Sequence, residues 1–417
     1  MSNNRIYYAS QTIQLRPQEA TPASSSDVFS GWYQPLGLQS VGMTTNFALE
    51  QAFQLGTVEL YDNVETTPEV EVTISRTIDT TAPLYLMCMG GKDGVDGAVG
   101  KPIVALANNR VNFRLGIYED SNQFISGNAS QHVVCSGMYL SSFKYTFPVD
   151  GNATEEVTLV GNHKIWNTGV FLGDNSYTFN AGNVFNPNTR VGNITPTSAS
   201  GILRRQYFNI IDSVLPIGSG GIKKPNSTGA DQVGGQLPHI QNITVSADLG
   251  RESINQLGKF APYCRYTTFP IEVTSEFEVI SPDGDYVDAK DFMNESFCNG
   301  RKTNLIPHTI VLAVCDMDNT NSNNTMQFNL GNKNTLTSVN HTGGDTGGGN
   351  VTVTYSFRNF NNFSISANGT YADGLKLAAG TASMQSIPGA AVDSGPVSTP
   401  DFSRYLNTNL DNNPGDL

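Results

Sequence analysis

Alternation of apolar and polar side chains is the clearest pattern along the chain. In residues 68–74 apolar side chains take every second position, and Glu69 and Glu71 stand between them. Residues 271–280 alternate in the same way, with Ser275 as the interruption. Successive side chains of a β-strand point to opposite faces of a sheet, so both segments are predicted as half-buried strands.

Other segments carry weaker versions of this pattern. Residues 46–55 fit a period of two, and they also fit a helical face after a cap at Thr45 or Asn46; we favour the strand. Residues 148–152 have the chemistry of a turn between two strands. Further strands are expected at 6–15, 111–118, 138–147, 155–160, 309–315 and 351–357.

Composition agrees with an all-β fold. Only 15% of the 417 residues are charged, against about 25% in a typical soluble domain. Long solvated helices, which need Lys and Glu, are therefore not expected. The 41 glycines and 20 prolines, with abundant Asn, Ser and Thr, favour strands and long polar loops. The length points to more than one domain.

Charge and cysteine content exclude several classes of protein. A net charge of −13 gives no general attraction to nucleic acid or to an anionic membrane. No apolar run approaches the ~20 residues of a membrane span, and residues 1–5 do not introduce a secretory signal. The five cysteines are widely spaced without a CxxC pair, so we expect free thiols in a protein made in a reducing cytoplasm.

An internal repeat relates residues 38–68 to residues 240–270. Laid together without a gap, the two segments share at least seven identities where chance gives about two. The resemblance continues after a one-residue slip at Glu71-Val72-Thr73 and Glu272-Val273-Thr274, and again between residues 140–158 and 336–354. The repeat-defining positions, besides the pair Glu50 and Glu252, are Gln39, Gln54, Leu55, Gly56, Tyr61, Pro68, Gln241, Gln256, Leu257, Gly258, Tyr263 and Pro270.

Alternation alone explains matched apolar positions, but it does not explain Gln-Leu-Gly, Tyr and Pro at matched distances. The sequence therefore predicts two tandem related β-domains, joined by a loop-rich insertion and flanked by arms. The predicted boundaries are 1–29 for an N-terminal arm, 30–165 for the first domain, 166–235 for the insertion, 236–371 for the second domain and 372–417 for an extended C-terminal arm.

Signatures of catalysis are missing from the sequence. None of the five histidines has HxxxH or HExxH spacing, and neither a GxSxG elbow nor a GxxxxGK[ST] phosphate loop occurs. The acidic segments 283–288 and 316–319 offer oxygen ligands for Ca²⁺ but lack the glycine and glutamate of a calcium loop, so solvated turns are favoured. We expect neither an enzyme nor a cofactor.

The repeat residues also carry a family resemblance. The segments 39–47, 50–51, 54–56, 59–61 and 71–73 resemble the tail tube proteins of long-tailed bacteriophages, and 155–162 followed by Trp166 is similar to a later strand pair of that family. The resemblance implies a β-sandwich-like domain that gives about four strands to a shared barrel around a DNA channel. Six single-domain subunits form such a ring, so a duplicated chain would form it with three.

Simple geometry agrees with a trimer. About 24 strands spaced ~4.8 Å apart and tilted ~40° close a barrel roughly 48 Å across at the backbone. After ~5 Å of side chain on each wall, roughly 38 Å remain, which admits a duplex about 20 Å wide. Six two-domain chains would leave a far wider pore.

Acidic side chains suit a channel that passes DNA without holding it, because carboxylates repel phosphate. Candidates for the channel wall are Glu50, Glu59, Glu69, Glu71, Glu252 and Glu272. Parity does not distinguish the channel from an outer solvated face, so that alternative stays open.

The sequence thus predicts a virion structural protein, the major tail tube subunit, in a phage tail. Its expected partners are further copies of itself in stacked rings, the tape measure protein and genomic DNA in the channel, and sheath, baseplate and terminator proteins; no membrane is expected. Two interpretations of the terminal segments stay open: arms that cross between neighbouring rings, or simple disordered tails. A baseplate hub or terminator ring is the alternative, followed by a capsid protein and a polysaccharide-degrading tail protein.

Overall fold

The computed structural model describes the sheets of the protein and their short connections. The described residues are 11–18, 35–79, 81–90, 99–117, 131–168, 202–212, 239–259, 262–280, 287, 309–314, 326–343 and 350–367. The terminal arms predicted at 1–29 and 372–417 fall outside these ranges except for 11–18, as do most of the predicted insertion and of both acidic segments.

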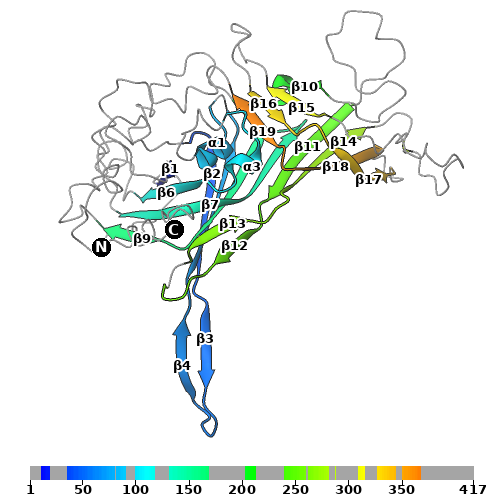
Figure 1. The fold of residues 1–417 in the computed structure, drawn as a ribbon. Helices are drawn as coiled ribbons and strands as arrows, with labels where there is room; N and C mark the ends of the chain where they lie inside the picture. The colour runs from blue at the N-terminus through cyan, green and yellow to red at the C-terminus, as the bar shows by residue number, and fades with distance from the viewer. Residues whose placement is uncertain are drawn as a thin grey trace, which may run out of the picture.

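One large antiparallel sheet runs through the molecule (Figure 1). Its main path is β17-β18-β14-β11-β7-β8-β5-β2. These strands are β2 (Leu38–Asn46), β5 (Glu69–Thr77), β7 (Gln131–Pro148), β8 (Thr154–Gly161), β11 (His239–Asp248), β14 (Glu272–Ile280), β17 (Thr335–Thr342) and β18 (Thr352–Phe360). The sheet also holds β6 (Arg110–Ile117) and β9 (Ile165–Thr168), which pair with β7, and β1 (Gln11–Gln18), which pairs with β6.

A second layer covers one face of this sheet. It consists of the four-stranded sheet β10-β15-β16-β19, with the short helices α1 (Leu84–Met89) and α3 (Ile103–Leu106). The four strands are β10 (Phe208–Asp212), β15 (Val311–Val314), β16 (Met326–Asn329) and β19 (Ser364–Ala367), and the turn η4 (Arg205–Tyr207) precedes β10.

Aromatic contacts join the two layers. The Phe143 ring stacks on Phe363 with centroids 4.9 Å apart, and Tyr145 meets Phe328 at the same distance. These rings belong to a single buried cluster that spans both predicted domains. The two segments of the predicted repeat therefore share one sheet and one core.

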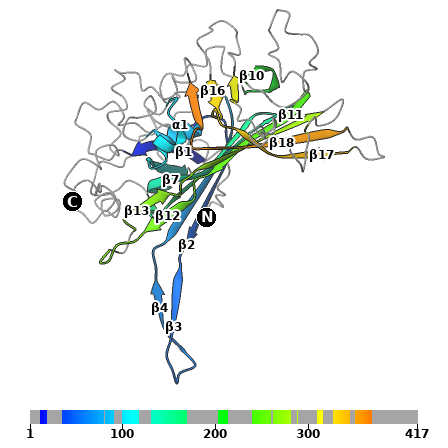
Figure 2. The ribbon, with the colours of Figure 1, turned by 45° about the vertical axis from the view of Figure 1, so that its right-hand side comes forward.

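Two β-hairpins leave the sheet between its strands. The pair β3 (Leu49–Phe53) and β4 (Leu60–Glu65) connects β2 to β5 and extends far beyond the body (Figures 1 and 2). The pair β12 (Arg251–Ile254) and β13 (Cys264–Thr267) connects β11 to β14 and stays close to the sheet.

The alternation in the sequence is confirmed as sheet structure. Val70, Val72 and Ile74 of β5 are buried while Glu69 and Glu71 are exposed. The ambiguous segment 46–55 contains a strand, β3, rather than a helix. The all-β fold class is thus confirmed in the described residues, where the helices have at most six residues.

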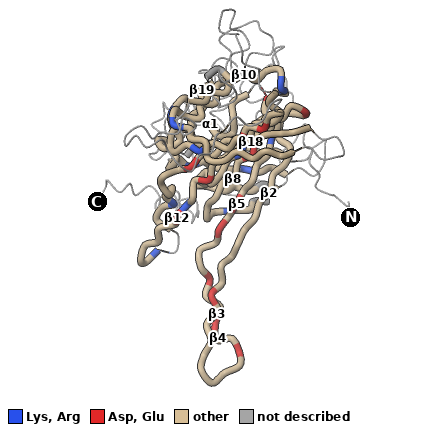
Figure 3. Tube along the Cα trace, turned by 90° about the vertical axis from the view of Figure 1, so that its right-hand side faces the viewer, with Lys and Arg blue, Asp and Glu red and all other residues tan. Residues whose placement is uncertain are grey.

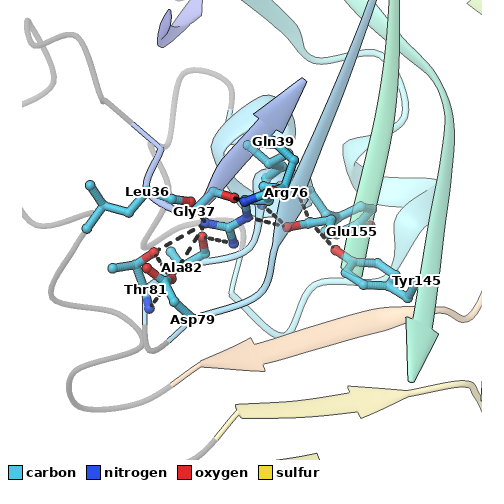
Figure 4. Close-up of polar contacts among 11 residues, drawn as sticks. Leu36, Gly37, Gln39, Arg76, Asp79, Thr81, Ala82, Tyr145 and Glu155 are labelled. Atoms are coloured by element: carbon cyan, nitrogen blue, oxygen red, sulfur yellow. Dashed lines mark hydrogen bonds and ion pairs between the residues drawn. The ribbon is translucent and has the colours of Figure 1, made fainter. Parts of the chain in front are cut away.

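A buried ion pair fixes the start of α1 on the large sheet (Figure 4). Arg76 Nε of β5 donates to Glu155 Oε2 of β8 at 2.8 Å, and both side chains are fully buried. Glu155 also accepts hydrogen bonds from the backbone N–H groups of Leu84 and Tyr85 and from the Tyr145 hydroxyl. Burial is the largest single influence and would lower the pKa of Arg76, but the charges of Glu155 and Asp79 and the hydrogen bond to Glu155 together outweigh it and raise that pKa.

Replacement of Arg76 by Met should lower the free energy of unfolding by about 3–5 kcal/mol, because Glu155 is left as an unpaired buried charge. Urea unfolding of the unassembled chain measures this loss. Arg358→Met is the matched control: its pair with Glu272 is nearly half exposed, and its loss should cost less than about 1 kcal/mol. Equal losses in the two variants would contradict the importance of the buried pair.

The described cysteines should differ in their reactivity. Cys88 and Cys135 are buried free thiols, and burial raises the pKa of both, that of Cys135 to about 12. Because the thiolate is the nucleophile, neither should react with iodoacetamide at pH 8 until the chain is unfolded. Peptide mapping by mass spectrometry checks this, with the less buried Cys264 as the internal comparison. Rapid labelling of Cys135 in the folded chain would contradict the packed core.

Candidate functional site: a polar sheet face and two open edges

The face of the large sheet that points away from the second layer is polar. On β14, Glu272, Thr274, Glu276 and Glu278 alternate with buried side chains. The register places Thr274 beside Ser246 of β11, and that row continues to Lys144 and Glu156. Charged members of this face are Glu69, Glu71, Glu156, Asp248, Glu272, Glu276, Glu278, Lys144 and Arg358. Carboxylates outnumber cations on it, so the face repels polyanions.

The main path of the sheet ends in two open edges. Among the described residues β2 pairs only with β5, and β17 pairs only with β18. An open edge presents unpaired backbone N–H and C=O groups, which favour pairing with another strand. The main path of the sheet can therefore be extended at both of these edges.

The two halves of the path have the same internal order. In the predicted repeat, β2, β5, β7 and β8 correspond to β11, β14, β17 and β18. The half β7-β8-β5-β2 and the half β17-β18-β14-β11 therefore list equivalent strands in the same order. The halves join where β11 pairs with β7, from Asn242 opposite Pro148 to Asp248 opposite Ser142. Because β11 is the repeat equivalent of β2 and β7 is that of β17, this junction joins the equivalents of the two edge strands.

Irregularities also recur at matching positions. A register shift lies between Leu38 and Ser40 in β2 and between Ile240 and Asn242 in β11. Another lies between residues 140 and 142 of β7 and between residues 336 and 338 of β17. Turn glycines with positive φ occur at Gly56 (89°) and Gly258 (82°).

The two hairpins have identical pairing. Leu49 faces Glu65 just as Arg251 faces Thr267, and the next three pairs follow with the same offset. In the strand that follows, however, the register pairs Asn46 with Glu69 and Asp248 with Glu272. The structural counterpart of Glu272 is therefore Glu69, which corrects the sequence alignment of Glu272 with Glu71.

The hairpin β12–β13, called the seated hairpin below, packs on the half of the sheet formed by β7-β8-β5-β2. Arg251 donates from Nε and Nη2 to the Leu140 carbonyl at 2.8 and 2.6 Å and lies over the Tyr139 ring. Arg265 pairs with Glu69 at 2.8 Å and donates to Asn162. Burial lowers the pKa of Arg251 to about 10, and it raises the pKa of Tyr139.

The hairpin β3–β4 makes no such contact in the described chain. Its acidic residues are Glu50, Glu59, Asp62 and Glu65, and residues 49–65 contain no Lys or Arg. In Figure 3 the tube of this hairpin accordingly carries red segments and no blue ones. Large apolar side chains on and beside it are exposed, namely Phe47, Leu49, Phe53, Leu55, Val58, Leu60, Tyr61 and Val64. An exposed apolar surface of this kind marks an interaction site.

The structure divides the sequence-predicted glutamates into two groups. Glu69, Glu71 and Glu272 lie on the polar face, where Glu69 and Glu272 each form an ion pair with an arginine. Glu50 and Glu252 lie on hairpin strands. Glu59 lies just before β4.

Sequence reasoning missed several members of the polar face. Glu276 and Glu278 share the parity of Glu272 on one recognised strand, so the alternation itself contained the signal. Asp248 and Glu156 join the face only through the pairing of strands that lie far apart in the sequence. Their pairing had no signal in the sequence.

Among the described residues no group of three or more His, Cys, Asp or Glu is placed to hold a metal ion. Within the same ranges no helix has the length and apolar character needed to cross a membrane.

Comparisons with known proteins give partial structural matches. One chain of the cryo-EM structure of the anti-feeding prophage (AFP) baseplate, 6-fold symmetrised, aligns over all of its length and 41% of this chain, with a TM-score of 0.29 and 11% identity. A chain of the native gene transfer agent (GTA) virion aligns over 98% of its length and 39% of this chain, with a TM-score of 0.23 and 11% identity. A chain of the empty GTA particle tail, refined with C6 symmetry, gives the same coverage and TM-score at 13% identity. No family model and no curated protein matches the sequence.

Proposed function

We propose that this protein is a structural component of a phage tail and, more specifically, the major tail tube subunit. Three copies form a ring around a DNA channel, and the rings stack. The observation that carries the proposal is the repeated strand order of the sheet: an interior junction joins β11 to β7, and the equivalent strands β2 and β17 are its open edges.

The interior junction supplies a register for closing the ring. In each β11–β7 pair, the β11 residue can be replaced by its equivalent in β2 and the β7 residue by its equivalent in β17. This places Gly42 of one copy opposite Thr342 of the next, and Thr44 opposite Asn340. Both pairs then lie on the polar face, as their counterparts Thr244 with Thr146 and Ser246 with Lys144 do. Pairing in this register satisfies the edge backbone groups of β2 and β17 in every copy.

The strand count favours three copies. Eight strands form the main path of one chain. Three chains give a barrel of about 24 strands, whose channel of roughly 38 Å passes duplex DNA. The polar face would line this channel, and its carboxylates would keep phosphate from binding.

Duplication of one domain explains the matched order, bulges and hairpins. We therefore propose two related units in residues 30–165 and 236–371, fused into one sheet, with 166–235 between them and arms that join neighbouring rings. The tape measure protein and DNA would occupy the channel. Sheath, baseplate and terminator proteins would contact the outside and the ends of the tube.

Ring closure is testable with a pair of cysteines at opposite edges. Oxidation of the double variant Thr44→Cys, Asn340→Cys should give a ladder of cross-linked chains that ends at three on non-reducing gels. Each single variant is the control and should give no ladder. A ladder that ends at six chains would contradict the trimer, and the lack of any ladder would contradict the edge pairing. Single rings that never stack under electron microscopy would favour a hub or terminator.

Reversal of charge on the polar face should make assembled tubes retain DNA. Glu71→Lys together with Glu276→Lys introduces cations that release counterions from phosphate, so retention should fall steeply with added salt. Labelled duplex that co-sediments with the tubes measures the effect. Glu59→Lys, at the hairpin turn outside the sheet face, is the matched control. Retention by the control alone would contradict the polar face as the channel wall.

A further inference from the structure

The free hairpin β3–β4 and the seated hairpin β12–β13 are the same element in two different surroundings. The four cross-strand pairs of β12–β13 correspond one to one to the first four pairs of β3–β4. Leu249, just before β12, is completely buried and donates its backbone N–H to the Ser141 carbonyl of β7 at 2.8 Å. Its counterpart Phe47 is 71% exposed.

We propose that β3–β4, with Phe47 at its base, packs on the β17 side of a second copy of this chain. It would repeat there the contact that β12–β13 makes with the β7 side of its own chain. This inference rests on the proposed edge pairing of β2 with β17, because that pairing places the second copy. The contact is lateral, between neighbours in one ring.

The seated hairpin identifies the residues that would take part. In β12–β13, Arg251 and Arg265 donate to the sheet, Cys264 Sγ lies 3.4 Å from the Tyr139 hydroxyl oxygen, and Thr267 donates to the Ala107 carbonyl after α3. Their counterparts in β3–β4 are Leu49, Asn63, Asp62 and Glu65. Leu49 and Phe47 thus form the apolar part of the contact surface, and Glu65 is its charged part.

The surface that would receive the hairpin lies on the half of the sheet formed by β17-β18-β14-β11, next to the β17 edge. The seated hairpin contacts Tyr139, Leu140 and Glu69, whose counterparts are Thr335, Leu336 and Glu272. Beside them Phe360 is 42% exposed, and the half-exposed Arg358 pairs with Glu272 at 2.6 Å. An apolar ring and an arginine complement Leu49 and the carboxylate of Glu65.

The acidic character of the free hairpin favours a copy of this chain over another kind of partner. Four carboxylates without a cation exclude phosphate-rich surfaces, while apolar side chains between them need a protein surface to cover them. The matched hairpin already occupies such a surface inside the chain.

Substitution at the hairpin base tests the contact. Phe47→Ser should raise the concentration at which rings dissociate at least tenfold, as measured by sedimentation velocity. The fold should be unaffected, because Phe47 is exposed in the single chain; equal unfolding midpoints of the unassembled proteins check this. Leu55→Ser is the control, since its counterpart Leu257 is fully exposed even in the seated hairpin.

Hydrogen exchange gives an independent measurement. On assembly, the amides of residues 47–53 and 60–65 should become protected, and those at the turn, 54–59, should not. An unchanged dissociation concentration for Phe47→Ser, or no added protection, would overturn the hairpin contact. If the Thr44→Cys, Asn340→Cys ladder still forms in that case, the proposed function stands; if no ladder forms, both proposals fail.

Discussion

Backbone pairing between β11 and β7 is the interaction on which the whole arrangement depends. It joins two four-stranded halves into one sheet and buries the backbone groups of one pair of edges. The same topology leaves the equivalent edges, β2 and β17, without a partner among the described residues. A sheet that satisfies a junction inside the chain and exposes the same junction at its ends is suited to extension by identical copies.

The buried face of the sheet holds a carboxylate, Glu155, whose charge is satisfied by the ion pair with Arg76. Glu155 stands next to Glu156 on β8, yet the first is buried with Arg76 and the second lies on the polar face. Two backbone N–H groups of α1, the Tyr145 hydroxyl and Arg76 all donate to Glu155, which offsets the cost of burying its charge. The core face can therefore hold a carboxylate without becoming a second polar surface.

Much of the fold could be predicted from the sequence because half-buried strands show apolar and polar residues in alternation. The same signal marked Val70, Val72 and Ile74 as core and Glu69 and Glu71 as surface. The ungapped repeat alignment also agrees with the observed register through both hairpins. It shifts afterwards because Ile271, a buried residue, stands between Pro270 and the strand, whereas Glu69 follows Pro68 directly.

Partner choice between strands could not be predicted in this way. Alternation shows which face a side chain takes but carries no information on which strand lies beside it. The pairing of Arg76 with Glu155 spans 79 residues, and the row that contains Glu156 and Lys144 spans several distant strands. Such groups become visible only when the order of the sheet is known.

The different chemistry of the two hairpins has a physical reason under the proposed assembly. The contact inside the chain forms during folding, so it can use arginines whose partners are always present. A contact between copies must leave each free chain soluble. Leucine and phenylalanine next to acidic residues satisfy this requirement, because the carboxylates repel premature association and the apolar groups stabilise the contact once edge pairing has aligned two copies. Divergence between equivalent hairpins would then separate the contact that folds the chain from the contact that assembles it.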